Sequence, residues 1–135
     1  MKGIFAAVLV ILVGWELLWW ILGVTPVFPW QLRGMLADPQ RAPILLDVRT
    51  SLEYNWFHIE GAINRPDVFD HAATQDLEGA HRPIVVVCLS GHRSPIMGYL
   101  MRRRGIQDVS YLSWGMLSWF LSGGSVVQGR DRSGP

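Results

Sequence analysis

Residues Ile84 to Ser94 read IVVVCLSGHRS and begin with the clearest β-strand pattern in the chain. This β-branched opening is typical of a strand buried on both faces of a parallel sheet, and we predict that strand over Ile84–Cys88. A helix is predicted over Arg93–Arg104, and Gly91 permits the tight loop between the two elements. This pattern places Cys88 at the end of a strand, directly before a short loop and a helix.

The segments on either side repeat this alternation of strands and helices. Further strands are predicted at Ile44–Val48, Gly61–Asn64 and Val109–Leu112, and further helices at Trp30–Ala37, Ser51–Trp56 with Ser51 as its cap, Asp67–Leu77 and Trp114–Leu121. Strands separated by helices pair in parallel through right-handed crossovers. We therefore predict an α/β fold in which an open, mainly parallel sheet carries helices on both faces. The domain is expected over residues 26–127, followed by a flexible tail over 128–135.

A long apolar segment precedes this domain. Ile4 to Val24 contains a single charge, at Glu16, and as a helix it would be roughly 30 Å long, the thickness of a bilayer core. Trp19 and Trp20 stand near its end, where aromatic rings favour the membrane interface. The run is longer than the apolar part of a secretory signal, and no small-residue cleavage motif follows it. We predict an uncleaved transmembrane anchor over residues 1–25, preceding the domain as a single pass.

Glu16 is the costly residue of this segment, since a charge near mid-membrane costs about 2–3 kcal/mol. Two interpretations stay open: contact with a neighbouring helix, or a polar residue tolerated among strongly apolar ones. Lys2 precedes the segment, whereas Arg33 and Arg41 follow it only at a distance. By the positive-inside rule, this distribution favours a cytoplasmic N-terminus and a periplasmic domain.

The composition excludes several classes of function. The net charge of the 135 residues is only +1 and their basic residues form no stripe, so nucleic acid is not an expected partner. Cys88 is the single cysteine, which excludes an intrachain disulfide. The four histidines, His71 among them, show no metal-ligand spacing, so a metal site is not expected.

The loop after Cys88 has the composition of an anion cradle. Backbone N–H groups of a tight loop and of a helix N-terminus converge on one centre and favour negative charge there. A cysteine at that centre is favoured as thiolate, and Arg93 adds a positive charge. A buried cysteine that merely closes a strand is the commoner case by position alone. The combination of a glycine loop, Arg93-Ser94 and a following helix favours the chemical interpretation.

Four segments together resemble the motifs of rhodanese-like domains over about Val27 to Val127. They are Ile44–Arg49 with Glu53 and Tyr54, His58–Asn64, Cys88–Ser94, and Tyr111–Met116 with Trp119. This sequence departs from the family pattern at two positions, because Phe57 replaces a glycine before the histidine and Trp114 replaces a glycine in the closing motif. Trp56, Phe57 and Trp114 would make the rim of the site more apolar, or rest on a membrane surface.

The resemblance implies a thiosulfate-type sulfurtransferase without a cofactor. Cys88 would take the sulfane sulfur of thiosulfate or of a small persulfide, and a thiol or a protein would accept it. The amides of the loop would hold the Cys88 persulfide, and the side chains of His92 and Arg93 would orient the donor. The loop residues concerned are Leu89, Ser90, Gly91, His92, Arg93 and Ser94.

Asp47 and Arg49, at the end of a predicted strand, are supporting candidates. Their position would allow a catalytic role, but the favoured interpretation is structural. Arg49 stands four residues before Glu53 and is expected to pair with it, while Asp47 is expected to bond nearby loop amides.

Two other functions compete with a turnover enzyme. Related phosphatases have five residues between the cysteine and the arginine of their loop, whereas four separate Cys88 from Arg93. The smaller cradle suits a sulfur atom better than a phosphate. The second alternative is a membrane-tethered persulfide carrier or binding module without significant turnover, which would have the same loop.

Overall fold

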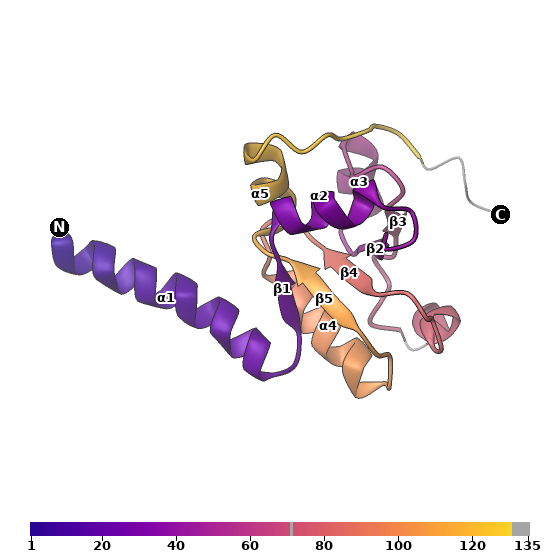
Figure 1. The fold of residues 1–135 in the computed structure, drawn as a ribbon, viewed down its shortest axis with the longest axis horizontal. Helices are drawn as coiled ribbons and strands as arrows, with labels where there is room; N and C mark the ends of the chain where they lie inside the picture. Colours follow the sequence, from indigo (N-terminus) through magenta and orange to yellow (C-terminus); the bar gives the residue numbers. More distant parts are fainter. Residues whose placement is uncertain (71, 131–135) are drawn as a thin grey trace.

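The computed structural model describes residues 1–70 and 72–130. Its centre is a five-stranded sheet in which every neighbouring pair is parallel (Figure 1). The strand order is β1-β5-β4-β2-β3, with β1 at Thr25–Val27, β2 at Ile44–Asp47, β3 at Ile63–Asn64, β4 at Ile84–Val87 and β5 at Val109–Leu112. The prediction of an open parallel α/β sheet is confirmed. The edge strand β1 was not predicted, because its three residues include Pro26 and it forms only by pairing with β5.

Five α-helices and one 3₁₀ helix accompany the sheet in the described part of the chain. They are α1 at Lys2–Ile21, α2 at Pro29–Ala37, α3 at Ser51–Trp56, η1 at Ala72–Leu77, α4 at Arg93–Arg103 and α5 at Gly115–Leu121. The helix predicted over Asp67–Leu77 is wrong in its first part, where turns precede the short 3₁₀ segment. His71, in that part, and residues 131–135 of the predicted tail lie outside the described residues.

The predicted cap of α3 is also corrected, because Thr50 and not Ser51 is its N-cap. Thr50 Oγ1 accepts a hydrogen bond of 3.3 Å from the Glu53 amide, and the Glu53 carboxylate accepts one of 2.9 Å from the Thr50 amide. This reciprocal arrangement satisfies two amide groups that the first turn of a helix otherwise leaves free.

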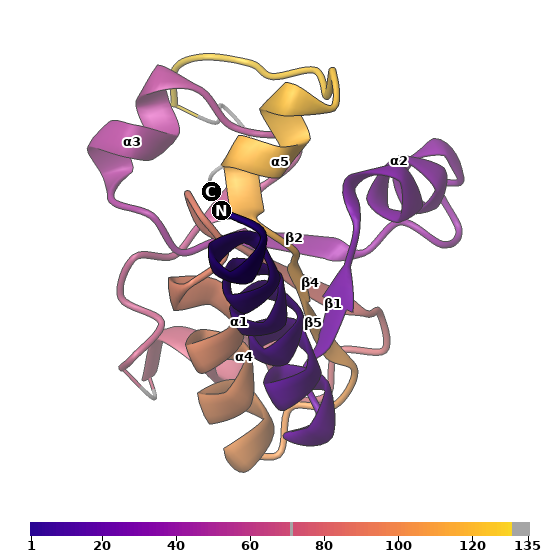
Figure 2. The same cartoon turned by 90° about the vertical axis from the view of Figure 1, so that its left-hand side faces the viewer.

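The sheet separates two apolar cores, as expected for buried parallel strands. Val86 of β4 faces the first core, which contains Met101 of α4 and Trp19 of α1. Val85 and Val87 face the second, which contains residues of α2, α3 and α5. Figure 2 shows α1 and α4 together on one side of the sheet and α2 on the other. Helices on both faces of the sheet are thus confirmed.

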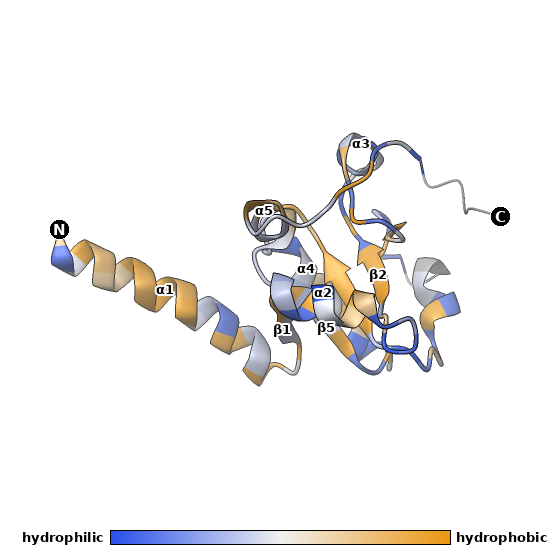
Figure 3. Ribbon diagram, turned by 45° about the horizontal axis from the view of Figure 1, so that its top comes forward, coloured by the Kyte–Doolittle hydropathy of each residue, from blue (hydrophilic) through white to orange (hydrophobic). Residues whose placement is uncertain are grey.

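Helix α1 has two parts with different surroundings. Its first part, from Lys2 to Gly14, is exposed and extends away from the domain as a straight, largely hydrophobic helix (Figure 3). Its second part packs on the domain, where Trp19 is 9% exposed and Trp15 is partly buried. By length and composition, α1 can cross a membrane, and a signal sequence would pass the same test.

Candidate functional site

Cys88 follows the last residue of β4 and its side chain is fully buried. The amide of Gly91 donates a hydrogen bond of 3.0 Å to the sulfur, and the thiol donates one of 3.3 Å to Ser94 Oγ in the first turn of α4. The sequence therefore placed the cysteine correctly at the junction of strand, loop and helix. The loop folds back so that one of its own amides contacts the sulfur.

The orientation of the loop peptides is fixed from outside the loop. The carbonyls of Cys88 and Leu89 accept hydrogen bonds of 2.8 and 3.0 Å from the amides of Met116 and Leu117 at the start of α5. Since N–H and C=O point in opposite directions in a trans peptide, the amides of Leu89 and Ser90 point away from α5. Within the described residues these two amides have no hydrogen-bond partner. The arrangement supplies free N–H donors of the kind that an anion cradle requires.

These hydrogen bonds require the backbone of the loop to lie very close to the start of α5. Gly91 has φ +77°, and a Cβ there would lie 2.6 Å from the Trp114 amide nitrogen. Gly115 has φ +58°, and a Cβ there would lie 2.3 Å from the Cys88 carbonyl oxygen. Both positions therefore exclude any side chain, for steric as well as conformational reasons.

The two departures from the family pattern have different consequences. Phe57 has φ −167°, an extended conformation that any residue adopts, so its side chain brings no backbone strain. Trp114 has φ +58°, the left-handed conformation that favours glycine. A tryptophan there costs roughly 1–2 kcal/mol of backbone strain. This strain lies immediately beside Gly91 of the cysteine loop.

Two aromatic rings lie beside the side chain of His92, which stays exposed to solvent. Its ring centroid lies 5.1 Å from that of Trp15 in α1 and 5.7 Å from that of Trp114. Ser90 Oγ lies 3.1 Å from His92 Nδ1. The Trp15 indole also donates a hydrogen bond of 3.4 Å to the Gly91 carbonyl. The loop is thus contacted by α1 as well as by α5, which sequence reasoning missed because Trp15 lies 76 positions from Gly91.

Arg93 points toward α3, where it forms a 3.1 Å ion pair with Glu53. Burial acts to raise the pKa of Glu53, but hydrogen bonds from Thr50 and the guanidinium of Arg93 outweigh it and leave the pKa below its usual value. The expected role of Arg93 in orienting an anionic donor would therefore compete with this ion pair. The Arg93 side chain is nevertheless about half exposed to solvent.

Asp47 and Arg49 form a fully buried ion pair with each other. Arg49 Nε and Nη2 donate to the two Asp47 oxygens at 2.9 and 2.7 Å, and Nη2 also donates to the Phe57 carbonyl at 2.7 Å. The expected pairing of Arg49 with Glu53 is wrong, because Glu53 binds Arg93 and Thr50 instead. The Asp47–Arg49 pair joins the end of β2 to the segment that follows α3.

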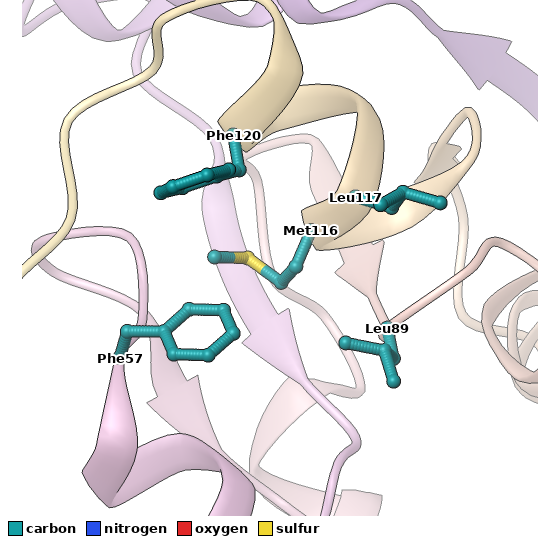
Figure 4. Close-up of a pocket in the computed structure, with 5 residues that line it drawn as sticks. All are labelled: Phe57, Leu89, Met116, Leu117 and Phe120. Atoms are coloured by element: carbon teal, nitrogen blue, oxygen red, sulfur yellow. The ribbon is translucent and has the colours of Figure 1, made fainter.

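An apolar pocket of about 360 Å³ lies beside the cysteine loop (Figure 4). Its lining residues are Phe57 after α3, Leu89 of the loop, and Met116, Leu117 and Phe120 of α5. Leu89 directly follows Cys88, so the pocket adjoins the loop. Among the residues that the structure describes, no group of three or more His, Cys, Asp and Glu side chains is placed to hold a metal ion.

Glu16 makes its contacts within its own chain. Its carboxylate accepts hydrogen bonds from the hydroxyls of Tyr111 in β5 and Ser113, the latter at 2.7 Å. Sequence reasoning offered a neighbouring helix or a tolerated polar residue, and neither describes this arrangement. A charge inside an apolar run was the signal that could have indicated a polar partner elsewhere in the chain.

A model of the family described as Rhodanese-like domain matches residues 29–122. The chain belongs to this family. The match covers α2 to α5 and includes the whole cysteine loop, so the four motifs identified in the sequence lie on the rhodanese fold. The strand β1 and the helix α1 precede the matched region.

Several relatives of this rhodanese-like chain extend the comparison. It is 29% identical over 98 residues to the tRNA uridine(34) hydroxylase of Protochlamydia amoebophila, and it spans 30% of that protein's length. The rhodanese-like domain of an Anabaena sp. protein is 29% identical, with a TM-score of 0.67 over 82% of this chain and 86% of that domain. The thiosulfate sulfurtransferase of Pseudomonas aeruginosa shares the fold, with 24% identity, a TM-score of 0.70, and coverage of 87% of this chain and 22% of that one.

Proposed function

We propose that Cys88 carries a sulfane sulfur, as a persulfide, from a small donor such as thiosulfate to a thiophilic acceptor. The observation that carries the proposal is the position of the sulfur, 3.0 Å from the Gly91 amide nitrogen in a loop whose neighbouring amides lack partners among the described residues. Membership of the rhodanese-like family supports the same chemistry. A sulfur-transfer activity of this general type fits a single buried cysteine.

The first step would be attack of the Cys88 thiolate on the sulfane sulfur of thiosulfate. A new S–S bond forms while the S–S bond of thiosulfate breaks, and sulfite leaves with the bonding electron pair. The product is a Cys88 persulfide whose outer sulfur is negatively charged. The amides of Leu89, Ser90 and Gly91 are the proposed donors to that charge, because charge-assisted hydrogen bonds are the stronger ones.

The second step would be attack of the acceptor on the outer sulfur. An acceptor thiolate becomes a persulfide, or cyanide becomes thiocyanate, and Cys88 leaves as a thiolate. No net oxidation of the protein occurs over the two steps. The proposed residues of the cradle are Leu89, Ser90, Gly91, His92, Arg93 and Ser94, with Asp47 and Arg49 holding the end of β2.

We further propose that α1 anchors the domain in a membrane and is retained. The support comes from the packing of its second part, because Trp19 belongs to the core and Glu16 bonds Tyr111 and Ser113. Cleavage of α1 as a signal sequence would remove these contacts and uncover part of the core. The distribution of Lys2, Arg33 and Arg41 supports a domain on the periplasmic side.

The experiment uses the full chain in detergent micelles, because α1 is part of the folded domain. The protein is incubated with thiosulfate and its intact mass is recorded before and after addition of cyanide. A gain of one sulfur atom that cyanide removes as thiocyanate would support the proposal, and Cys88→Ser is the matched control. Folded protein that gains no sulfur from thiosulfate or from a small persulfide would overturn it.

The rate of sulfur transfer separates the two candidate functions that share the persulfide. Repeated turnover with thiosulfate and cyanide supports an enzyme. A single stoichiometric loading, followed by slow release to small acceptors, supports a dedicated carrier.

A further inference from the structure

We infer that the outer face of α5 rests on the lipid bilayer that holds α1, so that the apolar pocket beside Cys88 opens at the membrane interface. The face is formed by Leu117, Phe120 and Leu121, and is called the α5 face below. The inference rests on the proposed membrane anchor. The α5 face would be a second surface of contact with the same bilayer, and lipid would cover it.

Helix α1 joins the domain without a flexible linker. The helix continues unbroken from its exposed part through Trp15, Glu16 and Trp19. These three residues contact the cysteine loop, β5 and the core, respectively. The direction of the exposed part is therefore fixed relative to the domain, and so is the position of any bilayer that surrounds it.

The exposed part of α1 from Lys2 to Gly14 is about 20 Å long at about 1.5 Å per residue. The hydrocarbon core of a bilayer is about 30 Å thick. The exposed part alone is thus too short to cross it, and the rest of α1 packs on the domain. To bury its apolar surface, α1 must draw the domain against the membrane surface.

The α5 face is the part of the domain that would meet the membrane surface. Leu117, Phe120 and Leu121 are 51%, 63% and 76% exposed, and their spacing places them on one side of a helix. Figures 1 and 2 show α5 on the side of the domain toward which the exposed part of α1 extends. Exposed apolar side chains gathered in this way are typical of a surface that contacts a membrane or a partner.

The α5 face is continuous with the pocket. Leu117 and Phe120 belong to both, and the pocket is lined entirely by apolar residues (Figure 4). An apolar helix face that lies on a bilayer is buried about 5–10 Å into the boundary of headgroups and acyl chains. The entrance beside Leu89 would then face the interface, and a sulfur acceptor dissolved in or bound to the membrane would reach the site directly.

The test measures which residues contact lipid, using the full chain with Cys88→Ser so that one introduced cysteine carries a nitrobenzoxadiazole label. Phe120→Cys reports on the α5 face and Phe69→Cys is the matched control, since both phenylalanines are about equally exposed, at 63% and 59%. The segment around residue 69 lies on the far side of the domain from α1 (Figure 1). Val10→Cys reports on the exposed part of α1.

Each variant is reconstituted into vesicles of phosphatidylethanolamine and phosphatidylglycerol, with or without a lipid that carries a nitroxide near the start of its acyl chain. We expect the labels at 10 and 120 to lose most of their emission to the nitroxide and the label at 69 to keep it. Leu121→Cys repeats the measurement if the Phe120 variant folds poorly.

The outcomes distinguish the inference from the proposals on which it rests. Quenching at 10 with no difference between 120 and 69 would overturn the inference and leave the anchor standing. No quenching at 10 would overturn the anchor and the inference together, while sulfur loading is measured separately at Cys88. Protection at 120 that depends on protein concentration and not on the nitroxide would indicate a second copy on this face, and would also overturn the inference.

Discussion

Glu16 of α1 accepts a hydrogen bond from the hydroxyl of Tyr111 in β5, across 95 positions of sequence. Burial raises the pKa of Tyr111, and the hydrogen bond and charge of Glu16 raise it further. The hydroxyl therefore keeps its proton at neutral pH and acts as donor. This contact joins the apolar N-terminal helix to the strand beside β4, whose end carries Cys88.

Replacement of Glu16 by alanine is expected to lower the free energy of unfolding by about 1–3 kcal/mol, because it leaves the buried Tyr111 hydroxyl without a partner. Glu16→Gln keeps an acceptor oxygen and should cost less. Tyr111→Phe should recover part of the lost stability in the Glu16→Ala background, since it removes the unpaired hydroxyl. Urea titrations of the full chain in micelles measure these differences, and an unchanged midpoint for Glu16→Ala would contradict the contact.

The left-handed conformation of Trp114 can be tested by replacing it with glycine and with alanine. Trp114→Gly and Trp114→Ala both remove the ring beside His92, but only alanine retains a Cβ at φ +58°. We expect the glycine variant to be more stable than the alanine variant by about 1 kcal/mol. Thermal midpoints give the comparison. Equal stability, or a more stable alanine variant, would show that the backbone there is not left-handed.

Gly91→Ala is expected to abolish sulfur loading at Cys88, because the new methyl group would displace the loop from the Trp114 backbone at 2.6 Å. Gly34→Ala is the matched control. It lies within α2 with no atom near its Cβ position, and alanine should stabilise that helix by about 0.5–1 kcal/mol. Intact mass after thiosulfate treatment gives loading, and far-UV circular dichroism gives folding. Normal loading in Gly91→Ala would refute the close approach.

The lowered pKa of Glu53 predicts a pH-dependent contribution to stability. The folded pKa lies below the ordinary value of 4.5, so the stabilisation is present above pH 4.5 and is lost as pH falls through the folded value. The parent chain should therefore have a higher free energy of unfolding than Glu53→Gln near neutral pH, and this difference should become smaller in acid. Urea midpoints over an acid series measure this difference. A difference that stays constant with pH would exclude the linkage.

Much of the fold follows from local patterns. The β-branched run at Ile84–Val87 and the alternation of strands and helices predict a parallel sheet, since each segment is long enough to show its own periodicity. The strand β1 could not be predicted, because three residues that include Pro26 carry no strand pattern and depend on β5 for their hydrogen bonds. The segment after Asp67 was assigned too long a helix, because composition alone does not distinguish turns from a short helix.

Some features of the candidate site could likewise be predicted from the sequence, and others could not. Cys88, its glycine loop and the following helix are adjacent in sequence, so their arrangement was predicted from the residues themselves. The ion pairs were not: Arg49 and Glu53 stand four apart, yet each pairs elsewhere. The partner of a charged side chain depends on how the helices and strands are placed relative to one another. The spacing of two residues along one short helix does not determine that placement.

Local sequence patterns were enough to predict the parallel α/β class, the cysteine at the end of the central strand and the apolar helix before the domain. These features depend on residues that are neighbours along the chain and on the period of their hydrophobicity. The packing of α1 on the domain through Trp15, Glu16 and Trp19 was visible only in the folded molecule. The same is true of the hydrogen bonds by which the start of α5 holds the carbonyls of the cysteine loop, so that the loop amides point away from α5. Such contacts join residues far apart in sequence, and they exist only when the folded sheet brings those residues together.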